Sequence, residues 1–241
     1  MIENKTGVAV PLSALRTESA PVIGEFSSLI EFADFAKKAG LSLIQLLPVL
    51  DTGTQSSPYS SLSAFALHPM YITLSEIEYF KPCYDKDTSF KRTYDLFLQH
   101  KKDARFDYDF VTRPMWHVPL STCNKALRRM FAVLSHTTQP QKFNEKFERF
   151  ERLLSFIKEN EDWLPYYCVY KHFKQRFLQA SWKEWEKTFQ TMTKEKIWEM
   201  WTDKTLEADL YYYAWVQFIA FKQFKKAAAY VKSLGITLKV D

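Results

Sequence analysis

Hydrophobic and polar positions at the start of the chain predict a strand, a helix and a second strand. Residues 7–12, GVAVPL, are a short apolar run that ends in a polar stretch, which predicts a buried strand. Apolar residues then recur at helical spacing over 28–39. Residues 42–47, SLIQLL, predict a second strand that is apolar on both faces, as in parallel sheets covered by helices. A strand–helix–strand unit of about forty residues is typical of a parallel βαβ fold.

The predicted helix over 28–39 carries recognisable signals at both ends. Ser28 and Glu31 have the spacing of a capping box, in which each side chain satisfies a free backbone N–H of the first turn. Gly40 stands where a C-terminal cap is expected, because glycine accepts the left-handed conformation that ends many helices. These signals define the limits of the helix.

A helical pattern dominates the middle of the chain. Residues 71–77, YITLSEI, first predict a short extended segment. Helical periodicity then predicts helices over residues 88–101, 121–135, 142–159, 162–178 and 194–200. Residues 106–116 predict an irregular connection, and Asp162 is placed to cap the helix that starts at Trp163.

The chain ends with a second helix–strand pair. A long helix is predicted from about Leu206 to Ser233, with Gly235 as its stop, and residues 236–240, ITLKV, predict a third strand. Asp241 follows at once, where ligand-binding groups sit in an α/β barrel, at the C-terminal end of a strand. Because a covering helix should follow such a strand, we expect the chain to be a truncated protein.

These elements predict an α/β fold, a partial (β/α)8 barrel that contains the first three strands and a large helical insertion. The expected parts are barrel strands one and two with a substrate loop, the helical insertion, and a barrel helix with strand three, over residues 1–80, 81–205 and 206–241. Low glycine content, 5 residues in 241, supports a mainly helical chain over an all-β one.

An uncharged, hydroxyl-rich segment, SPYSSLSAFALHPMY, follows the second predicted strand over residues 57–71. One interpretation is an ordinary surface turn rich in serine and proline. The other is a sugar-binding loop, because a tyrosine ring can cover the C–H face of a sugar and neutral hydroxyls exchange hydrogen bonds with it. On either interpretation, Ser60, Ser61 and Ser63 are expected to tie the loop's own backbone together.

Charge and cysteine content narrow the classes of partner. The net charge is +5 with both signs interspersed, so the basic stripe of a nucleic-acid binder is missing and we expect no nucleic-acid partner. Three cysteines, far apart and odd in number, give no disulfide or metal framework and suit a reducing cytoplasm. The N-terminus lacks the apolar region of a signal peptide, and no run has the length of a membrane span.

Several residues invite a catalytic interpretation that the sequence does not support. His68 precedes a proline in a rigid turn, with no triad pattern beside it, so a structural role is favoured. Asp51 lies in a Thr/Gly turn and is expected to form that turn, not an acid/base pair with Asp241. Trp182 and Trp185 could stack on glucan, but packing in the helical part is favoured.

The aromatic residues of the last long helix form a stripe. They recur at helical spacing at positions 211, 212, 213, 215, 218, 221 and 224. Such a stripe is more typical of a helix face packed into the core than of a cofactor site.

Several stretches together resemble 4-alpha-glucanotransferases of the amylomaltase, or disproportionating enzyme, family, glycoside hydrolase family 77. They are GVAVPLSALRTES (7–19), LIQLLPVLDTG (43–53), SPYSSLSAFALHPMY (57–71), NEDWLPYYCVYKHF (160–173) with Trp182 and Trp185, and YYYAWVQFIAFKQF…LGITLKVD (211–241). The resemblance covers the whole chain. The sequence ALHP at 66–69, where bacterial amylomaltases commonly have GNP, is closer to that of the plant cytosolic disproportionating enzyme.

The resemblance implies a (β/α)8 barrel, no metal or organic cofactor, and transfer of α-1,4-glucan segments between malto-oligosaccharides with retention of configuration. Retaining chemistry uses two carboxyl groups about 5–5.5 Å apart. The family's Arg-x-Asp-His motif, which carries the nucleophile, does not occur in the 241 residues, and no catalytic residue can be carried over. The expected partners are therefore α-1,4-glucans and the remainder of the barrel, and the chain alone is expected to be inactive.

The resemblance assigns three residues to substrate binding. Ser57 and Tyr59 match the family's loop after strand two, which lines the pocket beside the cleaved bond. Asp241 matches the aspartate of the family's Gly-Asp-x-Pro motif, which hydrogen-bonds sugar hydroxyls, although this sequence has Val240 where the family usually has glycine. The alternative to this function is a non-catalytic glycan-binding module or a truncated gene remnant.

Overall fold

A computed structural model of the chain describes residues 5–77, 80–86, 88–103 and 144–241. The chain divides into two compact units, Met1–Thr122 with Ile219–Asp241, and Cys123–Phe218. The helix predicted over 121–135 and the connection predicted over 106–116 lie outside the described residues. The three-part division expected from the sequence stays a prediction.

The first unit is built on a parallel sheet. Its strands are β1 (Gly7–Val10), β2 (Leu43–Leu46) and β3 (Thr237–Val240), in the order β1-β2-β3. All pairs are parallel, with Val8 opposite Ile44 and Ile44 opposite Leu238. The βαβ pattern and the third strand predicted from the sequence are therefore confirmed.

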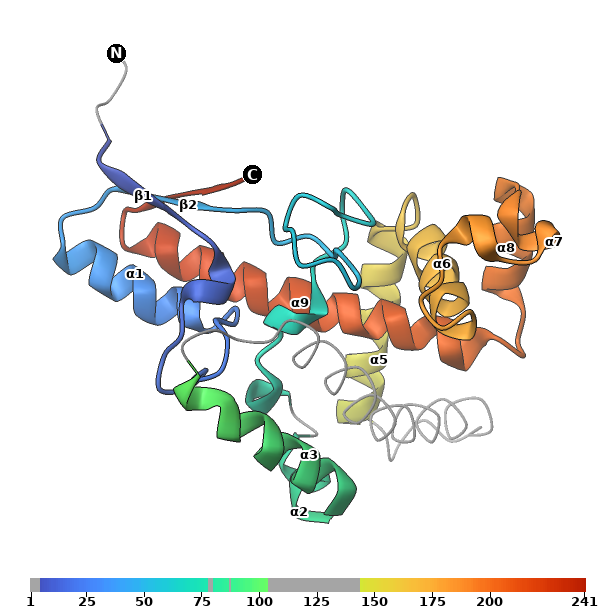
Figure 1. Cartoon of the computed structure of the whole chain (residues 1–241), viewed down its shortest axis with the longest axis horizontal. Helices are drawn as coiled ribbons and strands as arrows, with labels where there is room; N and C mark the ends of the chain where they lie inside the picture. Colours follow the sequence, from blue (N-terminus) through green and yellow to red (C-terminus); the bar gives the residue numbers. More distant parts are fainter. Residues whose placement is uncertain (1–4, 78–79, 87, 104–143) are drawn as a thin grey trace. The chain divides into compact units, whose positions relative to one another are not determined.

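Helices cover one face of this sheet. Figure 1 shows α1 (Ser28–Lys38) and the C-terminal part of α9 (Glu207–Ser233) on the same side of the strands. Ala36 and Ala227 on these helices are completely buried, as are Ile44 and Leu46 on the sheet. The burial of these apolar side chains stabilises the unit.

The opposite face of the sheet is open. Gly7 and Ala9 of β1 are exposed and Gln45 of β2 is half-buried, while the paired Lys239 of β3 is exposed. The prediction of a buried first strand and of a second strand buried on both faces is therefore wrong for this chain. The physical reason is that only one face meets helices.

The N-terminus of α1 differs from its prediction. Ser27 precedes the helix, and its side chain makes no capping hydrogen bond. Instead, Ser28 Oγ accepts from the backbone N–H of Glu25 at 3.0 Å, and Glu31 accepts from Ser19 Oγ at 2.6 Å. The predicted capping box is wrong because both of its side chains bind the preceding loop. Gly40, with φ of 75°, ends the helix as predicted.

Residues 71–77 do not form the predicted extended segment. Two 3-10 turns, η2 (Pro69–Tyr71) and η3 (Leu74–Glu76), take its place. Gln223 of α9 satisfies the backbone between them, because Thr73 N donates to Gln223 Oε1 at 2.8 Å and Gln223 Nε2 donates to Thr73 O at 3.0 Å. A side-chain amide therefore replaces a neighbouring strand as the partner of this backbone.

Two helices follow in the same unit. Helix α2 (Phe80–Lys86) was not predicted, whereas α3 (Thr88–Gln99), followed by the short turn η4 (His100–Lys102), confirms the helix expected over 88–101. Lys91 of α3 donates to Tyr84 Oη at 2.7 Å and to Asp95 at 2.8 Å. This exposed cluster holds the two helices together.

The second unit is helical in its described part. It contains α5 (Asn144–Glu159), α6 (Leu164–Arg176), η6 (Trp182–Glu184), α7 (Lys187–Gln190), α8 (Lys194–Thr202) and the first part of α9. Helices α5, α6, α8 and α9 confirm their predictions. Trp163, not Asp162, precedes α6, and no side-chain capping bond is made there, so the predicted cap is wrong.

Aromatic side chains form the centre of this unit. The rings of four residues pack together at centroid distances of 4.6 to 6.2 Å: Phe173, Phe177, Trp185 and Phe189. The Arg176 guanidinium lies 5.4 Å from the Phe189 ring centre. Trp185 is buried, as a packing anchor should be, whereas Trp182 is 46% exposed. The packing role predicted for the pair therefore holds for Trp185 only.

The aromatic stripe of α9 is packed against the protein, as predicted, since none of its seven residues is exposed. Tyr212 and Tyr213 are buried and the other five are half-buried, and Tyr213 Oη donates to Gln175 Oε1 at 2.9 Å. Among the described residues, no helix has both the length and the apolar content that a membrane span requires.

Candidate functional site

The C-terminal ends of the three strands lie at one edge of the sheet. This follows from their parallel pairing, which places Val10, Leu46 and Val240 in one row. Two of the residues assigned to substrate binding, Ser57 and Tyr59, belong to the segment after β2, and Asp241 follows β3 directly (Figure 1). Strand ends of this kind are where parallel α/β folds bind ligands.

The segment after β2 is a closed loop. An antiparallel bridge joins Leu50 to Leu67, Asp51 N donates to Ala66 O at 2.8 Å, and Leu62 N donates to Asp51 O at 2.7 Å. A loop whose ends meet and whose interior is bonded to itself is compact, not flexible. The loop over residues 51–67, called the β2 loop below, is therefore a preformed surface.

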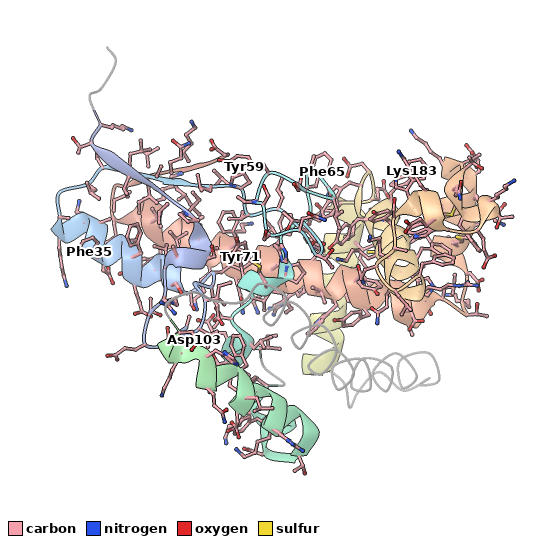
Figure 2. All side chains as sticks on the ribbon, viewed as in Figure 1. Phe35, Tyr59, Phe65, Tyr71, Asp103 and Lys183 are labelled. Carbon is pink, nitrogen blue, oxygen red and sulfur yellow. The ribbon has the colours of Figure 1, made fainter. Side chains whose placement is uncertain are left out.

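The predicted sugar-binding residues lie at the exposed tip of the β2 loop. Ser57 is exposed, and its carbonyl accepts from Ser60 N at 3.1 Å, which closes a turn around Tyr59. The Tyr59 side chain is 67% exposed and stands away from the ribbon, as does Phe65, which is 54% exposed (Figure 2). An aromatic ring held in water on a bonded loop can stack on a ligand.

The role predicted for Ser63 is confirmed. Its Oγ accepts from the backbone N–H of Phe65 at 3.1 Å and from that of Ala66 at 3.2 Å. The hydroxyl therefore serves the loop backbone and is committed there.

A pair of buried polar residues, Asp51 and His68, stands at the base of the β2 loop. Asp51 is completely buried and its Oδ1 accepts from Gly53 N at 2.8 Å, which confirms its predicted role in the turn. His68 is 1% exposed, and its Nδ1 accepts from Met70 N at 3.2 Å, so the ring proton is on Nε2. This Nε2 lies 4.0 Å from Asp51 Oδ1. The burial agrees with the structural role favoured for His68.

Replacing Asp51 tests whether this buried pair maintains the loop. Asp51→Ala should lower the free energy of unfolding by about 2 kcal/mol, because the Gly53 N–H loses its buried acceptor and the His68 ring loses the carboxylate 4.0 Å from its Nε2. Chemical denaturation of both proteins measures the difference. Thr54→Ala, at an exposed position of the same loop, is the matched control and should be neutral. Equal losses in both variants would contradict the account.

Asp241 lies on the open face of the sheet at the end of β3. Its backbone N–H donates to Leu46 O at 3.3 Å, which extends the β2–β3 ladder by one residue. Its Oδ1 accepts from Gln45 Nε2 at 2.9 Å and lies 3.8 Å from Lys239 Nζ. Val240, where the family usually has glycine, takes a regular strand position opposite Leu46. The Asp241 carboxylate is thus one-third exposed and held from one side.

The site therefore offers neutral hydroxyls, an aromatic ring and one carboxylate. In the described part of the chain, the hydrogen bonds of Asp241 go to Gln45 and Leu46 of β2, and none joins it to the β2 loop. Among the same residues, no cluster of three or more His, Cys, Asp and Glu side chains is placed to hold a metal ion. Sequence reasoning missed Gln45, although it is the lone polar residue in LIQLLPVL.

Comparison with known proteins assigns the family. The family model of glycoside hydrolase family 77, described as 4-alpha-glucanotransferase, matches residues 10–241. This chain belongs to that family. The match begins in β1 and runs through the β2 loop and both units to Asp241, so it includes every residue of the candidate site.

Curated members of this family align with nearly the whole chain. The 4-alpha-glucanotransferase DPE2 of Oryza sativa subsp. japonica is 29% identical over 98% of this chain and 23% of its own length. The 4-alpha-glucanotransferase of Clostridium butyricum is 30% identical over 91% of this chain and 40% of its own length. The chain thus spans between about a quarter and two-fifths of the length of these curated relatives.

Solved structures confirm the fold class. An amylomaltase from Streptococcus agalactiae, in complex with acarbose, matches with a TM-score of 0.73 at 19% identity, over 99% of this chain and 43% of that chain. The amylomaltase from Corynebacterium glutamicum matches with a TM-score of 0.68 at 16% identity, over 98% of this chain and 29% of that one. The sheet with its helices is therefore a partial amylomaltase barrel with a helical insertion.

Proposed function

We propose that this chain supplies the donor-sugar side of a 4-alpha-glucanotransferase site. The site would take part in moving α-1,4-glucan segments, from starch or maltose-type sugars, between malto-oligosaccharides by a retaining double displacement. The observation that carries the proposal is the placement of Asp241 and of Ser57 and Tyr59 after neighbouring strands, at the ligand-binding edge of a family member's sheet.

The chemistry of the three residues suits a neutral sugar. The exposed Tyr59 ring can lie against the C–H face of a glucose unit while its hydroxyl remains in water. The Ser57 hydroxyl can donate to and accept from a sugar hydroxyl, and the Asp241 carboxylate accepts strongly from hydroxyl donors. The β2 loop adds neutral hydroxyls and an aromatic ring to this carboxylate, and the charged side chain that lies beside it is that of Lys239.

Asp241 is a binding group in this proposal, not half of a catalytic pair. Retaining transfer requires two carboxyl groups about 5–5.5 Å apart, both able to reach the sugar. The other carboxylate that follows a strand end, Asp51, is completely buried and bonded to Gly53 N. It has no access to a ligand. This supports the view that the pair does not perform the chemistry.

A second candidate function is glycan binding by the helical unit. Trp182 is 46% exposed and Trp198 is 43% exposed, and exposed indole rings suit stacking on sugars. This would make the chain a glycan-binding module independent of the strand ends.

We also propose a cytoplasmic location. The three cysteines are far apart in the sequence and odd in number, which favours a reducing compartment.

Substitution of Tyr59 tests the proposal. Tyr59→Ala should weaken acarbose binding to the chain about tenfold, because stacking of a ring on a ligand is worth about 1 kcal/mol or more. Tyr59→Phe keeps the ring and is expected to bind within about twofold of the original chain. Calorimetric titration with acarbose measures both. If Trp182→Ala abolishes binding while Tyr59→Ala leaves it unchanged, the second candidate replaces the first.

A further inference from the structure

The register of the sheet puts three polar residues on one face. Gln45 of β2 pairs with Lys239 of β3, and side chains alternate between faces along each strand. Asp241, two residues after Lys239, therefore returns to the open face, diagonally across from Gln45. Diagonal neighbours in a sheet are about 7–8 Å apart at Cα, within reach of a long side chain.

The Gln45 side chain is long enough to contact the Asp241 carboxylate. Its Nε2 donates to Oδ1 at 2.9 Å, while the Asp241 backbone is held by Leu46 O at 3.3 Å. Lys239 Nζ, 3.8 Å from the same oxygen, has a side chain that is 58% exposed, and such a surface ion pair holds geometry weakly. The short bond from Gln45 is the better-defined constraint on the carboxylate.

We propose that Gln45 is a positioning residue for Asp241, which it orients toward the sugar in the donor site. The inference rests on the proposed function and adds a residue to it. The amide fixes the rotation of the carboxylate through Oδ1. The remaining acceptor positions of the carboxylate are then directed to sugar hydroxyls, since an ionised carboxylate has about four such positions.

The choice of glutamine has a physical reason. The rest of LIQLLPVL is apolar, and an apolar side chain at position 45 would serve the strand as well. A lysine there would place a second ammonium group beside the carboxylate, in addition to that of Lys239, whereas an amide donates a hydrogen bond without adding charge. Because hydrogen bonds to a charged acceptor are stronger than neutral ones, this preserves the affinity of Asp241 for hydroxyl donors.

A double-mutant cycle on acarbose affinity tests the proposal. Gln45→Met keeps the shape and removes the donor, and should weaken binding about fivefold. Asp241→Asn should weaken it by about tenfold or more. The double variant should bind within about twofold of Asp241→Asn alone, because Gln45 acts through Asp241. Thermal unfolding of each variant controls for loss of structure.

A spectroscopic measurement tests the contact itself. In the chain without sugar, the side-chain amide signals of Gln45 should shift as acid protonates Asp241, and Asp241→Asn should abolish that shift. A glutamine that does not contact the carboxylate in solution would show no such dependence.

The outcomes separate the two proposals. Additive losses in the cycle, or unchanged binding by Gln45→Met, would overturn the positioning role while the proposed function stands. A chain that binds no acarbose would overturn the proposed function, and the positioning role with it, even if the amide signals follow the acid titration.

Discussion

Glu25→Gln should raise the free energy of unfolding by about 5 kcal/mol at pH 8 and above, and by almost nothing near pH 4. Glu25 lies in the loop before α1 and is only 7% exposed. Burial raises the pKa of its carboxyl from 4.5 to about 8; the nearby Thr73 hydroxyl opposes this effect and the charge of Glu76 adds to it. A pKa difference of this size between the folded and the unfolded chain corresponds to about 5 kcal/mol of unfolding free energy.

The direction of the effect follows from proton binding. Below about pH 4.5, Glu25 is protonated in both the folded and the unfolded chain, so it contributes no pH dependence. Between 4.5 and about 8 the unfolded chain ionises while the folded chain keeps its proton. The stability is therefore lost progressively as pH rises through this window. Glutamine is neutral throughout and should remove the loss.

Denaturation of both proteins from pH 5 to 8.5 measures this difference. Glu18→Gln, at an exposed carboxylate in the same region, is the control and should leave the loss of stability between pH 5 and 8.5 in place. If Glu25→Gln also runs parallel to the original chain, with a constant offset across this range, the account of a buried neutral carboxyl is wrong.

Gly24→Ala should destabilise the first unit by at least about 3 kcal/mol. A Cβ at this position would lie 1.9 Å from Leu12 O, 2.8 Å from Leu15 N and 2.9 Å from Leu15 O. All three atoms belong to the backbone of the 3-10 turn η1 (Leu12–Ala14) and its cap, so no side chain can move aside. Gly24 N also donates to Ser13 O at 3.0 Å. The loop and the turn would have to separate.

A second glycine provides the control for this effect. Gly40→Ala adds a Cβ that meets no atom within 4 Å, although φ is 75°. The free energy of unfolding of this variant should fall by about 1–2 kcal/mol, which is the strain of a left-handed conformation alone. Equal losses for the two variants, measured by chemical denaturation, would contradict a steric role for Gly24.

Elements with a single strong periodicity were predictable from the sequence. The strand β2, with its run of apolar residues, and the helices α1, α6 and α9 were found close to their observed limits. Their signals are local, since each element is defined by its own apolar spacing. The aromatic stripe of α9 also indicated a packed helix face correctly, since none of its seven residues is exposed.

Features decided by distant residues were not predictable. The turns over 69–76 depend on Gln223, which lies about 150 residues away in sequence. The capping box failed because Ser19 competes for Glu31, and the exposure of β1 depends on which face of the sheet meets helices. A single sequence carries no direct signal of such contacts.

The candidate site also combines features that were predictable from the sequence with features that depend on distant residues. The β2 loop and Asp241 were recognised from sequence motifs shared with a family, and the structure describes both at the strand ends. The contact of Gln45 with Asp241 and the burial of Asp51 beside His68 require the fold. A lone glutamine in an apolar strand was the available signal for Gln45, because such a residue normally has a polar partner.

We propose that the strand ends of this chain bind a donor sugar. Backbone amide spectra of the ¹⁵N-labelled chain, recorded during titration with acarbose, measure this binding. We predict saturable shifts at Ser57, Tyr59 and Asp241, with no comparable change around Trp182 and Trp198. Shifts confined to the helical unit, or no shifts at saturating acarbose, would show that the strand ends do not bind the sugar.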